Sequence, residues 1–215
     1  MSDRLDHIQT RYRDPKVAAR YDQSRYVGAE ASLNLANMRR AIRQALRDVP
    51  ANARVLDAPC GTGIFTAYLS ELGYRTLASD ISLEMIAMAQ KNSQAQFFQG
   101  DLFRLPFRDG TISAVFCMRF MNLVDRPTRI RAVQAMAKTA PTLVVSYYHK
   151  YTVKYLGRWL RYKLGLRKTL NARLSRAELL AEIAESGLKL KQLISVAPGL
   201  SEAWIAVLER PHDDA

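Results

Sequence analysis

The chain has 215 residues, of which 48% are hydrophobic and 24% are charged. This length and composition fit one globular domain and exclude a disordered or collagen-like protein. No apolar run approaches the roughly 20 residues of a membrane-spanning helix, and residues 1–14 lack the apolar core of a secretory signal. We therefore expect a cytoplasmic protein.

The net charge of +12 indicates an anionic partner, such as nucleic acid, phospholipid headgroups or a phosphorylated substrate. The excess belongs to one region, because residues 126–177 hold thirteen lysines and arginines and no acidic residue. Cys60 and Cys117 belong to no C-x-x-C motif and have no histidine nearby in the sequence. We therefore expect neither a disulfide framework nor a metal site.

The first half of the chain alternates helix-like and strand-like patterns. Two helices are predicted at 15–26 and 31–47. A strand (53–58), a helix ended by Gly73 (65–73), a strand (74–80), a helix opened by Ser82 (82–92) and two strands (95–101 and 112–118) follow.

The second half continues the alternation. It predicts a helix (125–138), a strand (141–148), a helix (175–187) and two closing strands (188–196 and 202–210) that can pair antiparallel. Ser175 and Glu178 form a capping box at the start of the last helix. The sequence therefore predicts an α/β, Rossmann-like, doubly wound sheet of seven mainly parallel strands. It adds an antiparallel C-terminal strand, N-terminal helices and a basic helical insertion after the fifth strand.

Residues 55–66, VLDAPCGTGIFT, run from a buried strand into a glycine turn. The strand delivers Asp57 to the carboxyl edge of the sheet, where Gly61 and Gly63 allow a sharp turn against a ligand. Asp80 ends the next strand, where an acid can accept hydrogen bonds from both hydroxyls of a ribose. A nucleoside-bearing cofactor is predicted. Thr66 stands where a dinucleotide fingerprint would have its third glycine, which disfavours a dinucleotide.

The stretch VLDAPCGTG resembles the first motif of class I S-adenosylmethionine-dependent methyltransferases, although Pro59 replaces the first glycine of that motif. LASD, QGDLFRLPF and DGTISAVFCMRFMNLV resemble the family's later motifs, and the resemblance covers residues 14–209. It is closest to the small-molecule and lipid branch, which includes ubiquinone and menaquinone biosynthesis enzymes. Because proline lacks an N–H, a hydrogen bond from residue 59 is not expected.

The resemblance implies a role for each matched residue in binding S-adenosylmethionine. Asp57, Gly61 and Gly63 would hold the methionine portion, and Asp80 with Ile81 the ribose. Further residues are implied at the adenine (Asp101, Leu102), at the sulfonium (Met118, Arg119) and in a lid over the methionine carboxylate (Tyr21, Arg25).

Several of these residues also have a structural alternative, and Arg119 could be a solvated loop charge. The acids at the strand ends could cap helices or turns, and the lid residues could form an ordinary amphipathic face. Cys60 is interpreted as a small filler. Methyl transfer depends mainly on positioning, and a base is needed only if the acceptor loses a proton. His149, at the end of the fifth strand, is the predicted catalytic base, ahead of Tyr147 and Tyr148.

We divide the single domain, residues 1–215, into an N-terminal helical lid (1–50), a cofactor-binding core (51–147), a basic amphipathic insertion (148–174) and a C-terminal helix with a strand pair (175–210). The insertion could pack on the sheet as a substrate lid, contact an anionic membrane at its inner face, or bind nucleic acid. The expected acceptor is small or lipid-like and could be anionic, such as a quinone precursor or an envelope lipid. The alternatives are RNA methylation by the basic 126–177 surface and a non-catalytic interaction module.

Overall fold

The computed structural model describes residue 10 and residues 29–166, 171–198 and 201–211. Its first long helix, α4 (Ala29–Ala45), confirms the helix predicted at 31–47. The helix predicted at 15–26 lies outside the described residues, together with Tyr21 and Arg25.

The elements that follow agree in type and order with the predicted ones. They are β1 (Arg54–Asp57), α5 (Ile64–Glu71), β2 (Arg75–Asp80), α6 (Leu83–Asn92), β3 (Gln96–Gln99), β4 (Ala114–Cys117), α7 (Arg126–Ala137), β5 (Thr142–Tyr148), α8 (Val153–Lys163), α9 (Arg176–Glu185), β6 (Lys189–Ser195) and β7 (Ala203–Glu209). Side-chain caps fix several helix starts, because Ser82 accepts from the Met85 N–H and Ser175 forms the predicted capping box with Glu178.

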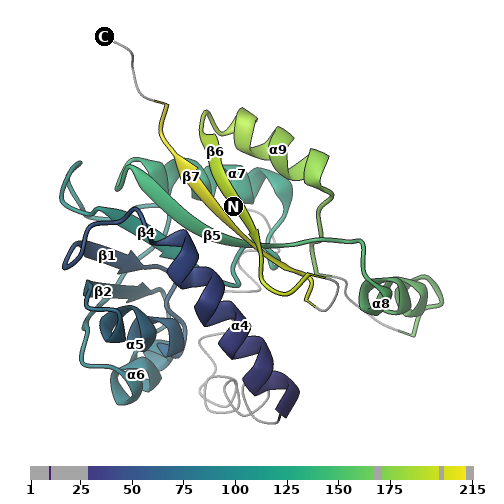
Figure 1. The fold of residues 1–215 in the computed structure, drawn as a ribbon, viewed down its shortest axis with the longest axis horizontal. Helices are drawn as coiled ribbons and strands as arrows, with labels where there is room; N and C mark the ends of the chain where they lie inside the picture. The colour runs from purple at the N-terminus through teal and green to yellow at the C-terminus, as the bar shows by residue number, and fades with distance from the viewer. Residues whose placement is uncertain (1–9, 11–28, 167–170, 199–200, 212–215) are drawn as a thin grey trace.

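The seven strands form one sheet in the order β3-β2-β1-β4-β5-β7-β6. The first five are parallel, whereas β7 runs antiparallel to both β5 and β6. The strand order reverses between β1 and β4, which is where open α/β sheets place their ligands. The Rossmann-like fold predicted from the sequence is confirmed, and Figure 1 shows the helices on the two faces of the sheet.

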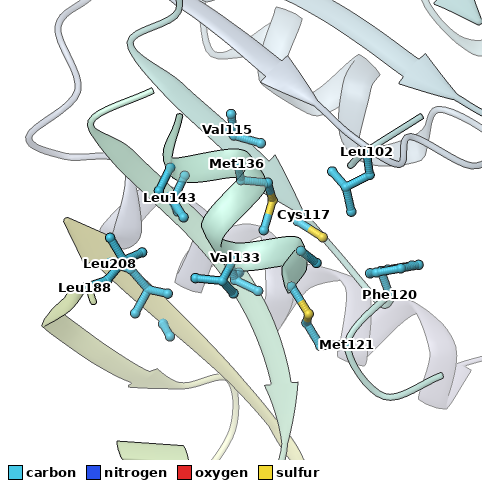
Figure 2. Close-up of a cluster of buried hydrophobic side chains, with 14 of the residues drawn as sticks. Leu102, Val115, Cys117, Phe120, Met121, Val133, Met136, Leu143, Leu188 and Leu208 are labelled. Carbon is cyan, nitrogen blue, oxygen red and sulfur yellow. The ribbon is translucent and has the colours of Figure 1, made fainter. Parts of the chain in front are cut away.

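The core consists of two main clusters of buried side chains, one on each face of the sheet. Successive strand residues point to opposite faces, so Val55 packs with α4 and α5 while Leu56 packs with α7 and α9. Figure 2 shows part of the second cluster, in which Val133 and Met136 of α7 lie over the strands. These helices fix the strand ends that carry the polar residues of the site.

A buried ion pair joins α7 to α9. The guanidinium of Arg129 donates from Nε to Oε2 of Glu182 at 2.8 Å and from Nη2 to Oε1 at 2.6 Å. Both side chains are almost fully buried. Arg129 also donates to the carbonyl oxygen of Val124 at 2.8 Å, so this pair links the helices to the loop after β4.

The predicted insertion contains α8, which stands away from the sheet (Figure 1). Thr152 caps its first turn by accepting from the Tyr155 N–H. The alternative that its apolar stripe packs on the sheet is wrong for the side chains described, because Leu156, Leu160 and Leu164 are exposed. Along the described part of the chain, no helix combines the length and apolarity required to cross a membrane.

Candidate functional site

A pocket lies at the carboxyl ends of β3, β2, β1 and β4, the four strands on either side of the reversal in strand order. Its empty volume, counted to include the open mouth, is about 1010 Å³. The lining contains three acids, one at or after each of β1, β2 and β3, namely Asp57, Asp80 and Asp101. Sequence-predicted residues Gly61, Ile81, Leu102, Met118 and Arg119 also line it.

The turn after β1 forms one wall of the pocket and uses its two predicted glycines differently. Both have positive φ, 54° at Gly61 and 80° at Gly63, a region that favours glycine. A Cβ on Gly61 would meet nothing within 4 Å, whereas one on Gly63 would lie 2.7 Å from the Cβ of Ala89. Gly61 therefore leaves space beside the pocket, and Gly63 lets α5 begin close to α6.

Pro59 stands in this turn without disturbing the sheet. Its neighbours supply the ladder bonds, because the Ala58 N–H donates to Phe116 O at 2.9 Å and the Cys60 N–H to Ser79 O at 2.8 Å. The missing N–H of proline is therefore not required by the strands. Cys60 is buried. Burial is the main cause that raises the pKa of its thiol, and the negative charge of Asp57 is the second cause. A thiol held in its neutral form is unreactive, which agrees with the predicted filler role.

Asp57 is buried at the end of β1. Its Oδ2 accepts a hydrogen bond from the Thr66 hydroxyl at 2.6 Å. Burial raises the pKa of Asp57 to about 7, the Thr66 bond opposes this rise, and the charge of Asp80 adds to it. The group is therefore poised between its neutral and charged forms near neutral pH, and a cationic group entering the pocket would favour the charged form.

Asp80 is held by the backbone of two loops. Its Oδ2 accepts from the Gly61 N–H at 2.9 Å and its Oδ1 from the Ser82 N–H at 3.0 Å. Burial raises its pKa, and these backbone bonds oppose the rise. The sequence left open that Asp80 only caps the next helix. Ser82 caps α6 instead, so α6 does not need Asp80 as its cap. A carboxylate can accept about four hydrogen bonds, which leaves capacity for ligand hydroxyls.

Asp101 is both a turn acid and a pocket residue. Its Oδ1 accepts from the Phe103 N–H at 3.0 Å, which closes the turn after β3. Gly100 before it allows a close approach, since a Cβ there would lie 2.6 Å from the Ser79 hydroxyl. That buried hydroxyl lines the pocket and has no hydrogen-bond partner among the described residues.

The loop after β4 forms the opposite wall. Arg119 adopts a left-handed backbone conformation, φ 60°, and its N–H donates to the buried hydroxyl of Ser146 at 2.7 Å. Non-glycine residues rarely adopt this conformation, and such residues cluster at functional sites. Phe120 and Leu123 continue the wall as apolar residues.

The predicted base, His149, lies outside the residues that line the pocket. Its Nε2 is 3.1 Å from the carbonyl oxygen of Ser201, and its ring stacks on Trp204 with centroids 4.9 Å apart. Because a carbonyl only accepts, this nitrogen carries the proton, and only Nδ1 could act as a base. Tyr147 is buried, which raises the pKa of its hydroxyl further from neutral pH. Base catalysis by His149 stays a prediction.

Several residues of the site were not predicted from the sequence. They include Ser79, Gly100, Ser146 and Asn92, whose side-chain amide donates to the Thr62 carbonyl at 2.8 Å and ties α6 to the glycine turn. These residues join the site through contacts with residues that are distant in the chain, and a local sequence pattern does not record such contacts. Ser79, Gly100 and Ser146 each stand next to a predicted residue, Asp80, Asp101 and Tyr147 respectively, but adjacency alone does not show that they join the site.

Comparisons with known proteins find sequence similarity over part of the chain and a similar fold over nearly all of it. Residues 55–140 match a family described as "Methyltransferase domain". The chain is 35% identical over 133 residues to a demethylmenaquinone methyltransferase of Mycolicibacterium gilvum, covering 60% of this chain and 55% of the relative. It is 31% identical over 126 residues to a ubiquinone biosynthesis O-methyltransferase of Xanthomonas axonopodis pv. citri, covering 55% and 53%. The chain thus spans little more than half the length of these relatives.

The fold extends the likeness to the whole chain. A crystal structure of magnesium protoporphyrin IX methyltransferase from Synechocystis PCC 6803 with bound S-adenosylhomocysteine superposes with a TM-score of 0.74, covering 96% of this chain and 99% of that one at 18% identity. The resemblance seen in the sequence motifs is confirmed. Residues 55–140 match the methyltransferase domain family, and the chain as a whole has the fold of a methyltransferase with bound S-adenosylhomocysteine.

Proposed function

We propose that the protein transfers a methyl group from S-adenosylmethionine to an acceptor bound beside the loop after β4. The observation that carries the proposal is the pocket at the strand ends, with one acid at or just after the end of each of three adjacent strands. When bound, the cofactor supplies an electrophilic methyl group on a sulfonium ion. The protein's part is to hold the two reactants in line and to exclude water.

The residues present fit this cofactor. The unpartnered Ser79 hydroxyl and the remaining acceptor capacity of Asp80 offer hydrogen bonds at the pocket wall, and the open space beside Gly61 admits a ligand. In the proposal, Asp57 and the glycine turn hold the amino-acid end, Asp80 with Ile81 the ribose, and the segment from Asp101 to Leu102 the adenine. Met118 and Arg119 flank the reacting centre.

We propose an acceptor that is small or lipid-like and carries an anionic group, such as a quinone precursor or an envelope lipid. Phe103, Phe120 and Leu123 offer an apolar wall, and Arg119 adds a cation to the same lining. The quinone-pathway names of the two relatives support this class. The proposal includes peripheral contact with an anionic membrane, because such acceptors partition into lipid.

RNA is the second candidate acceptor. It is favoured by the basic 126–177 segment, in which exposed aromatic side chains accompany the lysines and arginines. Bases can stack on such rings while the cations contact phosphates. Neutral, hydrophobic acceptor analogues would not be methylated by an enzyme of this kind.

Calorimetric titration of the purified protein with S-adenosylmethionine and S-adenosylhomocysteine tests the proposal, with NADH as the control. Saturable binding of the first two without the third is expected. If none of the three binds, the methyltransferase proposal fails and a non-catalytic interaction module takes its place. Once binding is established, transfer of a radiolabelled methyl group to quinone precursors, membrane lipids and RNA compares the acceptor classes.

A further inference from the structure

The insertion carries a concentrated apolar surface. Large hydrophobic side chains in and just after α8 are between 40% and 75% exposed, and we call five of them the docking face: Leu156, Trp159, Leu160, Leu164 and Leu166. Scattered exposed apolar residues are ordinary, but a contiguous group marks a surface that is covered in use. Only a few other large hydrophobic side chains among the described residues are as exposed.

The helix presents this face away from the body of the protein. Leu156, Leu160 and Leu164 are spaced by four residues and share one side of α8. Arg158 lies about half a turn away, at 100° per residue, and pairs with Glu202 at the end of the β6–β7 connection. The side of α8 bearing Arg158 is therefore the attached side, and the leucines face outward.

Glu202 fixes the insertion at both of its ends. Its Oε1 accepts from the hydroxyl of Thr152, the cap residue of α8, at 3.0 Å. Its Oε2 accepts from Nε and Nη2 of Arg173, at 3.1 and 3.0 Å. One residue earlier, the Ala172 N–H donates to the carbonyl oxygen of Asn122 at 2.9 Å. Since Asn122 lies between the pocket residues Phe120 and Leu123, the insertion returns beside the acceptor side of the pocket.

The charge around the docking face is uniformly positive. Arg161 and Lys163 are exposed in the last turn of α8, and the Lys163 ammonium lies 5.9 Å from the Trp159 ring centroid. No acid occurs from residue 126 to 177. The bordering acids are already paired, Glu178 with Lys150 and Glu202 with its two arginines. An apolar face with a cationic margin complements anionic lipid, in which the leucines and Trp enter the headgroup region.

We propose that α8 docks on an anionic lipid surface by burying the docking face, and that this contact brings the acceptor side of the pocket to the membrane. With 11 residues, α8 is about 16 Å long, which suits a helix lying in the interface and is too short to span a bilayer. The identity of the acceptor rests on the proposed function, whereas lipid binding can be measured without it.

Vesicle flotation with the full chain tests the docking. The probes are phosphatidylcholine vesicles and the same vesicles containing phosphatidylglycerol. Wild type is expected to float with the anionic vesicles and to be released by high salt. Arg161→Gln with Lys163→Gln should weaken this binding by roughly fivefold for each charge removed. Arg158 is left intact because it pairs with Glu202.

Matched variants distinguish the loss of the docking face from a general change in surface charge or hydrophobicity. Leu156→Gln with Leu160→Gln should abolish flotation, whereas Leu180→Gln, an exposed leucine of α9, should not change it. Lys91→Gln with Lys138→Gln removes two exposed charges elsewhere and should also bind normally. Trp159 emission should shift to the blue on anionic vesicles, and Trp159→Phe should lose the shift although Trp204 remains.

Any of the following outcomes would overturn the inference: no flotation of wild type, equal loss in the control variants, or assembly of copies through the docking face in lipid-free solution. Preference for single-stranded RNA over vesicles at equal salt would also overturn it. Calorimetry with S-adenosylhomocysteine on the same preparations keeps the two proposals apart. Cofactor binding without lipid binding refutes only the docking, and lipid binding without cofactor binding refutes only the proposed function.

Discussion

Replacing Gly63 by alanine tests the contact that holds the glycine turn against α6. The new Cβ would lie 2.7 Å from the Cβ and 2.9 Å from the Cα of Ala89, and the residue would keep a φ of 80°. The left-handed conformation costs about 1–2 kcal/mol for alanine. Forcing a methyl group into a packed contact costs about 1–3 kcal/mol more. We therefore expect the free energy of unfolding to fall by about 2–5 kcal/mol.

Gly61→Ala is the matched control. It carries only the conformational cost, about 1–2 kcal/mol, because its Cβ meets nothing within 4 Å. Gly61 lines the pocket. In this variant, the loss in free energy of S-adenosylmethionine binding should therefore exceed the loss in free energy of unfolding. Urea unfolding followed by circular dichroism measures the stabilities, and calorimetry measures the affinities.

A double-mutant cycle makes the test specific. Ala89→Gly removes the Cβ that Gly63→Ala would strike, at a cost of about 1 kcal/mol for glycine in a helix. The double variant should be less destabilised than the sum of the single ones. Additive effects, or equal losses for Gly61→Ala and Gly63→Ala, would refute the packing argument.

Three further predictions concern buried acids. Asp80→Ala should weaken S-adenosylmethionine binding by about 1–3 kcal/mol in calorimetry, and unchanged affinity in a folded variant would contradict the ribose assignment. Folding raises the pKa of Asp57 from 3.8 to about 7, so the folded chain binds more protons in this window. This aspartate should therefore cost the protein without cofactor up to about 4 kcal/mol of stability as pH rises from 4 to above 7. Asp57→Asn should remove that loss in urea unfolding at pH 5 and 8, and an unchanged pH dependence would count against it. Glu182→Gln, which leaves Arg129 buried without its anion, should cost about 3–5 kcal/mol. Glu185→Gln, in an exposed pair, should cost about 0–1 kcal/mol, and similar losses in the two variants would refute the argument.

The order of the elements could be predicted because each leaves a local signal. Alternation of buried and exposed positions, Ser82 and Ser175 at helix starts and glycine at turns act within a few residues. The acids at the strand ends were found in the same way, since strand ends and glycine turns are adjacent in the chain. The helix containing Tyr21 and Arg25 stays a prediction.

The rest of the site depends on contacts that no local pattern records. Ser146 reaches the Arg119 N–H from the neighbouring strand, and Ala89 limits Gly63 from another helix. The sequence showed α8 to be amphipathic, but periodicity cannot tell whether an apolar stripe faces the sheet or the solvent. The ion pair between Arg158 and Glu202 shows which side of α8 faces the protein. These two residues are 44 positions apart in the sequence and meet only in the fold, so no local pattern could have revealed the pair.

The position of β7 has a consequence for synthesis of the protein. Translation produces β6 before β7, yet β6 can join the sheet only through β7, which separates it from β5. Until residues 203–209 leave the ribosome, β5 has a bare edge and β6 has no partner in the sheet. A nascent chain arrested before residue 203 would already contain all the strands that surround the pocket, and it would expose the unpaired edge of β5. The final segment thus closes the sheet rather than building the site.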